Sequence, residues 1–142
     1  MGRNDCYIYQ LVQQEGVMEL ALTKSPPVAS KVVTKATVRA AEKLGIKASA
    51  LAKIVGVSQP TISRMRKGDY LLEPGQKAFE LAVSFVRLYR SLDALMGGDD
   101  AVSADWIKNR NTALDGIPLE LIQTAPGLFN VIDYLDARRA IV

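Results

Sequence analysis

The stretch LAKIVGVSQPTISRM, residues 51–65, has the residue pattern of two short helices that cross over a tight turn. Ala52 is small where the two helices would touch, and Gly56 permits the sharp turn between them. Ser58 is a favourable N-cap for the second helix, and Pro60 is tolerated in a first turn whose amides have no helical partner. The apolar residues of the shared core are Leu51, Val55, Val57, Ile62 and Met65. The stretch therefore predicts a helix-turn-helix, which Gly68 would end shortly after Met65.

The outward face of the second helix is polar and basic. With Ile62 and Met65 turned inward, this face carries Gln59, Pro60, Ser63, Arg64 and Lys67. It is the face that enters a major groove in this motif, where Gln59 suits an adenine edge and Arg64 suits guanine. Phosphate contacts are expected from Thr61, Arg66, Lys67 and the lysines of the preceding helix. The alternative interpretation is a helical hairpin used only for packing or dimerisation, with its basic residues solvated.

The charge of the chain is divided unevenly between its halves. Residues 1–70 carry 11 Lys or Arg against 5 Asp or Glu, a net charge of +6, whereas residues 71–142 carry 7 against 10, a net charge of −3. A basic half attracts polyanions such as DNA, and an acidic half does not. The asymmetry indicates a nucleic-acid partner for the first half and a different partner for the second.

The segments around the helix-turn-helix are also predicted to be helical. Residues 28–44 are predicted to form a basic amphipathic helix that Gly45 ends. An N-terminal arm, residues 1–27, precedes it and ends in the helix-breaking Ser-Pro-Pro at 25–27. Within the arm, a short helix is expected around 12–22. Residues 76–96 form a long helix whose apolar arc is too broad for one core face, which indicates a central position and a candidate subunit interface.

Short helices are expected in the remainder of the chain. Ser103 is expected to cap one that runs through Trp106, Pro118 to open one over residues 119–123, and Pro126 to open a last one to about Ala140. No period-two strand pattern persists. The prediction is an all-α protein with a helix-turn-helix domain at 28–72, followed by a small helical domain at 73–142.

Composition excludes several classes of function. The chain has no histidine and one cysteine, Cys6, so the usual zinc sites, imidazole-dependent triads and an intrachain disulfide are not expected. No glycine-rich strand-to-helix turn is present for NAD. We expect no enzyme activity, no cofactor and no metal. Residues 1–10 lack a signal-peptide pattern and no membrane span is present, so a cytoplasmic protein is expected.

Seven segments together resemble a known family. They are SQPTISRMRKG at 58–68, ELA at 80–82 leading into VRLYRSLDALMGG at 86–98, DWI at 105–107 with NRN at 109–111, ALDG at 113–116, PLELI at 118–122, TAPG at 124–127 and YLDARR at 134–139. In this order and spacing they resemble the Xre antitoxins of Res-Xre toxin–antitoxin pairs, whose C-terminal half is the MbcA-ParS-Xre antitoxin domain. The single Gly116, where the family often has two glycines, and the N-terminal arm depart from the pattern.

The resemblance implies a function. The protein would bind a Res-domain toxin that consumes NAD, block its substrate pocket with the C-terminal end, and repress the operon that encodes both proteins. In this chain the blocking end corresponds to Tyr134, Asp136, Arg138, Arg139, Ile141 and Val142. The alternative interpretation of Arg138 and Arg139 is that they only interact favourably with the negative end of the helix. Core positions are expected for Trp106, Leu114, Pro118 and Leu121.

The resulting prediction is a homodimeric antitoxin that presents two recognition helices to a palindromic operator, since helices one DNA turn apart need a two-fold axis. The first alternative is a free-standing helix-turn-helix repressor whose C-terminal half only oligomerises. The second is a toxin-neutralising protein with a vestigial DNA motif.

Overall fold

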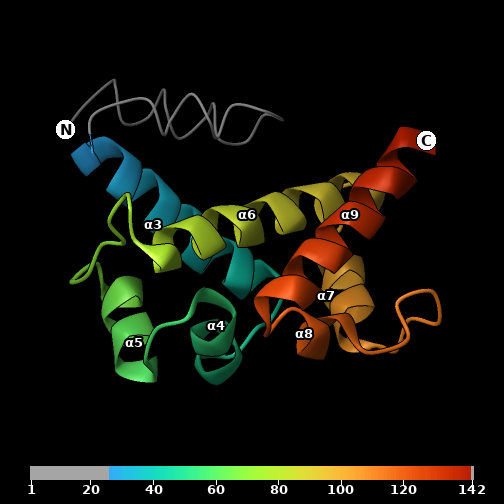
Figure 1. Ribbon diagram of the computed structural model, residues 1–142, viewed down its shortest axis with the longest axis horizontal. Helices are drawn as coiled ribbons and strands as arrows, with labels where there is room; N and C mark the ends of the chain where they lie inside the picture. The colour runs from blue at the N-terminus through green and yellow to red at the C-terminus, as the bar shows by residue number, and fades with distance from the viewer. Residues whose placement is uncertain (1–25, 142) are drawn as a thin grey trace.

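The computed structural model describes residues 26–141, and this part of the chain is built from helices (Figure 1). They are α3 (Pro26–Lys43), α4 (Ala48–Val55), α5 (Gln59–Lys67), α6 (Lys77–Leu95), α7 (Asp100–Lys108), α8 (Pro118–Leu121) and α9 (Ala125–Ile141). A single antiparallel bridge joins Asn111 and Gly116 within the described range. The all-α prediction is confirmed there, whereas the N-terminal arm up to residue 25, with Cys6, and Val142 lie outside the described residues.

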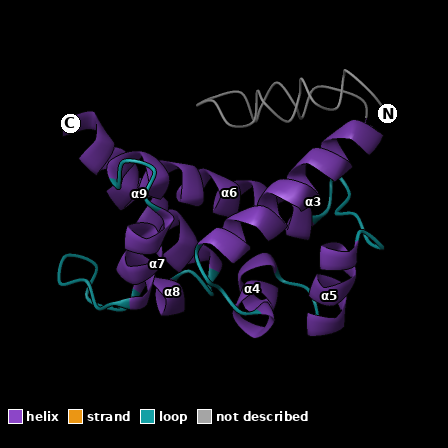
Figure 2. Ribbon diagram, turned by 180° about the vertical axis from the view of Figure 1, so that it is seen from behind, coloured by secondary structure: helices purple, strands orange, loops and turns teal. Residues whose placement is uncertain are grey.

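The long helix α6 lies at the centre of the molecule. It packs against α3 and α4 along its first part and against α9 and α7 along its second (Figures 1 and 2). Its fully or almost fully buried residues are Phe79, Ala82, Phe85, Val86, Leu88, Ser91 and Leu92. These contacts lie within one chain and account for the broad apolar arc, whereas the subunit interface stays a prediction.

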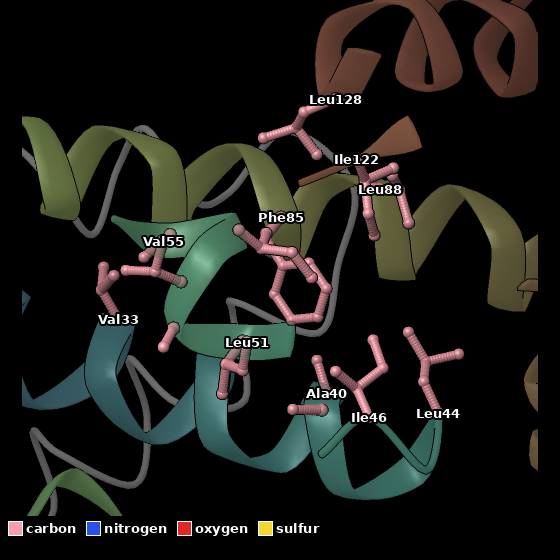
Figure 3. Close-up of a cluster of buried hydrophobic side chains, with 14 of the residues drawn as sticks. Val33, Ala40, Leu44, Ile46, Leu51, Val55, Phe85, Leu88, Ile122 and Leu128 are labelled. Carbon is pink, nitrogen blue, oxygen red and sulfur yellow. The ribbon is translucent and has the colours of Figure 1, made fainter. Parts of the chain in front are cut away.

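One hydrophobic core runs through both halves of the described chain. Figure 3 shows Leu44, which directly follows α3, and Leu51 of α4 on one side of Phe85, and Ile122 and Leu128 on the side of α8 and α9. All five of these residues are completely buried. Burying side chains of this size contributes about 1.5–3 kcal/mol each, so the two halves share a large part of their stability.

The start of α7 differs from the expectation. The N-cap is Asp99, whose carboxylate accepts bonds from the amides of Ala101 and Val102 at 3.0 and 3.2 Å. Ser103, expected to be the cap, lies inside the helix and is fully buried, on the same side as Ile107. The expected cap was wrong because helix 100–108 begins one turn earlier, directly after the glycines that end α6.

In residues 26–141 no helix is both long enough and apolar enough to cross a membrane.

Candidate nucleic-acid interface and C-terminal site

The turn between α4 and α5 has the geometry that the sequence predicts. Gly56 adopts a left-handed conformation with φ of 82°, and the amides of Gly56 and Val57 both donate to the carbonyl of Ala52, at 2.8 and 3.0 Å. A left-handed φ favours glycine because it has no Cβ. Leu51, Val55 and Ile62 are completely buried between the helices. The turn therefore fixes the angle at which α5 leaves α4.

The first turn of α5 is held by side chains. Ser58 Oγ accepts a hydrogen bond from the amide of Thr61 at 3.2 Å, and the hydroxyls of Ser58 and Thr61 are 2.8 Å apart. Thr61 is only 8% exposed, and its Oγ1 accepts a bond from Arg64 Nη2 at 3.3 Å. The structure thus turns the Thr61 side chain inward, against the expectation of a phosphate contact, because its hydroxyl links the N-cap to Arg64.

The outward face of α5 is exposed along its whole length. The exposed residues on it are Gln59, Pro60, Ser63, Arg64 and Lys67. Arg66 is also exposed, but its Nη2 donates to the carbonyl of Ile46 at 3.4 Å, so its side chain turns back toward the loop before α4. The five residues of the recognition face therefore lie together, and Arg66 lies on their flank.

Arg64 has a second neighbour that sequence reasoning missed. Its guanidinium carbon lies 5.2 Å from the ring centre of Tyr70, a residue that follows the end of α5. No periodic pattern marks this pair, since Tyr70 lies in the loop after the helix and not on the helix itself.

Lys43, at the end of α3, is turned away from α5. Its Nζ lies 4.0 Å from an Asp100 oxygen of α7 and 6.0 Å from the ring of Tyr89. The Tyr89 hydroxyl donates to Asp100 at 3.2 Å. Burial, and next the negative charges of Asp93 and Asp100, raise the pKa of Tyr89 well above its usual value. This cluster joins α3, α6 and α7, so Lys43 belongs to the contact between the two halves.

Two of the predicted toxin-contact residues of α9 are bonded to α6. The carboxylate of Asp136 accepts from Arg87 Nη2 at 2.5 Å and from Ser91 Oγ at 2.9 Å. Ser91 is only 1% exposed, and its hydroxyl in turn accepts from Arg139 Nη1 at 3.1 Å. Asp136 and Arg139 therefore anchor the last turns of α9.

Two other predicted contact residues lie on the surface near the end of α9. Ile141 is 83% exposed, and Arg138 is exposed with its guanidinium carbon 6.0 Å from the centre of the Tyr134 ring. Tyr134 is half-buried and stacks on Trp106, with ring centres 6.4 Å apart and an interplanar angle of 16°. Val142 lies outside the described residues. The end of α9 thus presents Arg138 beside Tyr134, which stacks on Trp106, and leaves Ile141 exposed.

The residues expected in the core of the C-terminal half lie there. Pro118 is buried, and Trp106, Leu114 and Leu121 are half-buried against the main hydrophobic core. No group of three or more Cys, Asp or Glu residues within 26–141 is arranged to hold a metal ion.

The recognition face and the end of α9 lie far apart. Figures 1 and 2, taken from opposite sides, both place α5 at the lower edge of the molecule and the C-terminal turns of α9 at the upper edge across from it. The two candidate surfaces therefore do not overlap.

Comparison with protein families agrees with this division into two surfaces. Residues 25–87 match the family model described as the antitoxin Xre-like helix-turn-helix domain, and residues 91–140 match that of the antitoxin Xre/MbcA/ParS C-terminal toxin-binding domain. No curated protein matches the chain. The first match covers the helix-turn-helix with α3 and most of α6, and the second covers α7, α8 and nearly all of α9.

Proposed function

We propose a specific role for this chain, which belongs to the Xre-type antitoxins of toxin–antitoxin systems and has their helix-turn-helix and toxin-binding domains. The chain neutralises a Res-domain toxin that degrades NAD, by occluding the active site of the toxin. It also represses the operon that encodes the pair by binding operator DNA. The boundary between the two functional halves falls between residues 72 and 73, in the loop from α5 to α6.

The observation that carries the proposal is the separation of the two candidate surfaces. The exposed face of α5 and the C-terminal turns of α9 lie at opposite edges of the molecule (Figure 1). A toxin bound at α9 therefore leaves α5 accessible to DNA. This arrangement suits a protein that holds its toxin and its operator at the same time, and a plain repressor has no need of it.

Occlusion is proposed to be the task of the exposed end of α9. Ile141 offers an apolar group that a cleft would bury, and Arg138 offers a cation for acidic or phosphate-binding surroundings. Tyr134 supports Arg138, while Asp136 and Arg139 hold the helix in place. Val142 completes the proposed contact set.

Operator binding is proposed for the exposed face of α5. Gln59 and Arg64 contact base edges, Pro60 and Ser63 lie against the groove, and Lys67 and Arg66 contact phosphates, with Thr61 acting through its bond to Arg64. The protein acts as a homodimer on a palindromic site, because two recognition helices one DNA turn apart need a two-fold axis.

The toxin half of the proposal is tested with the gene that neighbours this one. Cellular NAD and growth are measured when that gene is induced alone, with the full chain, and with a chain that ends at Ala137. NAD should fall in the first case, be preserved in the second and fall again in the third, because the truncation removes Arg138 and Ile141. The control Asn130→Ala, exposed on the same helix, should still protect.

The DNA half is tested with the double variant Gln59→Ala and Arg64→Ala. It should lose repression of a reporter driven by the promoter of the operon and keep full protection of NAD. If induction of the neighbouring gene leaves growth and cellular NAD unchanged, the toxin half is overturned and a free-standing repressor remains. Full repression by the double variant would overturn the assignment of the recognition face.

A further inference from the structure

Arg64 is held in one orientation by two contacts within the chain. Its Nη2 donates to the hydroxyl of Thr61 at 3.3 Å, and its guanidinium carbon lies 5.2 Å from the centre of the Tyr70 ring. A guanidinium within about 6 Å of an aromatic ring centre is attracted by the negative face of the ring. The two contacts restrict the rotamers of an otherwise flexible, exposed side chain.

Tyr70 is itself fixed on both sides. Before it, the end of α5 closes with the amide of Asp69 bonded to the carbonyl of Arg64 at 2.8 Å, which turns the chain back toward that residue. After it, the amide of the fully buried Leu72 donates to Thr34 Oγ1 of α3 at 2.9 Å. Tyr70 is half-buried against the core between these two points. The position of its ring is therefore set by the fold and does not depend on DNA.

We propose that Tyr70 is a specificity-determining residue of the DNA interface, because it orients Arg64 for a bidentate bond to one guanine. The inference rests on the proposed operator binding and adds a residue outside the recognition helix. A guanidinium that is already oriented loses less conformational freedom when it binds. A bidentate contact needs both donors in the plane of the base edge, so its selectivity depends on that orientation. Tyr70 touches no base and acts as a positioning residue.

The probe for the test is a pool of random-sequence duplex DNA, from which the full chain selects its preferred site. Binding to the selected duplex, and to copies with one base pair changed, is then measured by fluorescence anisotropy. Arg64→Lys keeps the charge but loses the planar fork, so it identifies the base pair that Arg64 reads. Tyr70→Phe keeps the ring, and Tyr70→Leu removes it.

Tyr70→Phe should keep the guanine preference at the base pair that Arg64 reads. Tyr70→Leu should lose about twofold to fivefold of that preference, as expected for an exposed cation–π contact. The preference at the other base pairs and the salt dependence of binding should stay unchanged, because phosphate contacts are not involved. Thr61→Val, which removes the other contact of Arg64, should weaken the same preference.

The inference is overturned if Tyr70→Leu keeps the full preference, or if it lowers the affinity equally at every base pair while thermal unfolding shows a folded protein. If Tyr70→Leu unfolds, Tyr70→Met decides in its place, because it also removes the ring but keeps a long apolar side chain, and an unchanged preference overturns the inference. If the wild-type chain selects no sequence, operator binding itself is refuted. This result differs from sequence-selective binding that does not change when Tyr70 is replaced, which refutes only the role of Tyr70.

Discussion

Asp136→Ala is expected to destabilise the protein by breaking the network that anchors the end of α9. The carboxylate accepts from Ser91, which is 1% exposed, and from Arg87, whose side chain is 65% exposed. A hydrogen bond to a charged acceptor contributes about 1.5–3 kcal/mol, whereas an ion pair with an exposed partner contributes about 0.2–1 kcal/mol. Because the network lies near the end of a helix, we take the lower part of the combined range. We therefore expect the free energy of unfolding to fall by about 2 kcal/mol.

The assay is thermal unfolding followed by circular dichroism. For a chain of this length a loss of about 2 kcal/mol lowers Tm by about 6–8 °C. The matched control is Asp133→Ala, an exposed aspartate on the same helix, in which the gain in helix propensity on replacing Asp by Ala is the same. Arg87→Ala removes only the exposed ion pair and should cost less than about 1 kcal/mol.

Two results would refute this reasoning. Equal Tm values for Asp136→Ala and Asp133→Ala would mean that the network does not hold α9. A loss for Arg87→Ala as large as that for Asp136→Ala would mean that the exposed ion pair, and not the bond from Ser91, provides the stabilisation.

Three further variants test other parts of the fold. Ser58→Ala removes the N-cap of α5 and should cost about 1 kcal/mol in urea unfolding; an unchanged midpoint would contradict the capping role. Gly127→Ala should cost more than about 3 kcal/mol, because its Cβ would lie 1.8 Å from the carbonyl oxygen of Leu121, and a stable variant would contradict the packing of α8 on α9. Burial and nearby carboxylates raise the pKa of Tyr89, so the unfolded chain loses this proton first as pH rises. The contribution of Tyr89 to the free energy of unfolding should therefore be complete below about pH 10 and be lost as pH rises above it. Tyr89→Phe should reduce that fall, and an unreduced fall would assign it to other groups.

Most of the helical architecture could be predicted from local signals. The turn at Gly56, the cap at Ser58 and the prolines that begin α8 and α9 act on their own segment of chain, so their effect can be read in the sequence. Ser103 shows the limit of such signals. Two residues able to cap a helix lie one turn apart, and the burial of Ser103 in the core favours Asp99.

Contacts between distant residues could not be predicted in this way. Arg87 and Asp136 are 49 positions apart, so no periodic pattern connects them, and the sequence suggests only toxin contact for Asp136. The broad apolar arc of α6 was visible, but it did not indicate whether the partner helices belong to the same chain. That depends on how α3 and α9 fold back onto it.

The central position of α6 has a thermodynamic consequence for the whole antitoxin. Phe85 and Leu88 pack within a single core that includes residues from α3 to α9, so neither half can unfold without exposing apolar surface of the other. By mass action, a ligand that binds only the native state raises the free energy of global unfolding by RT ln(1 + L/Kd), where L is the free ligand concentration. DNA bound at the proposed site on α5 would therefore also protect the C-terminal half against global unfolding, and a partner bound at the proposed site on α9 would also protect the helix-turn-helix.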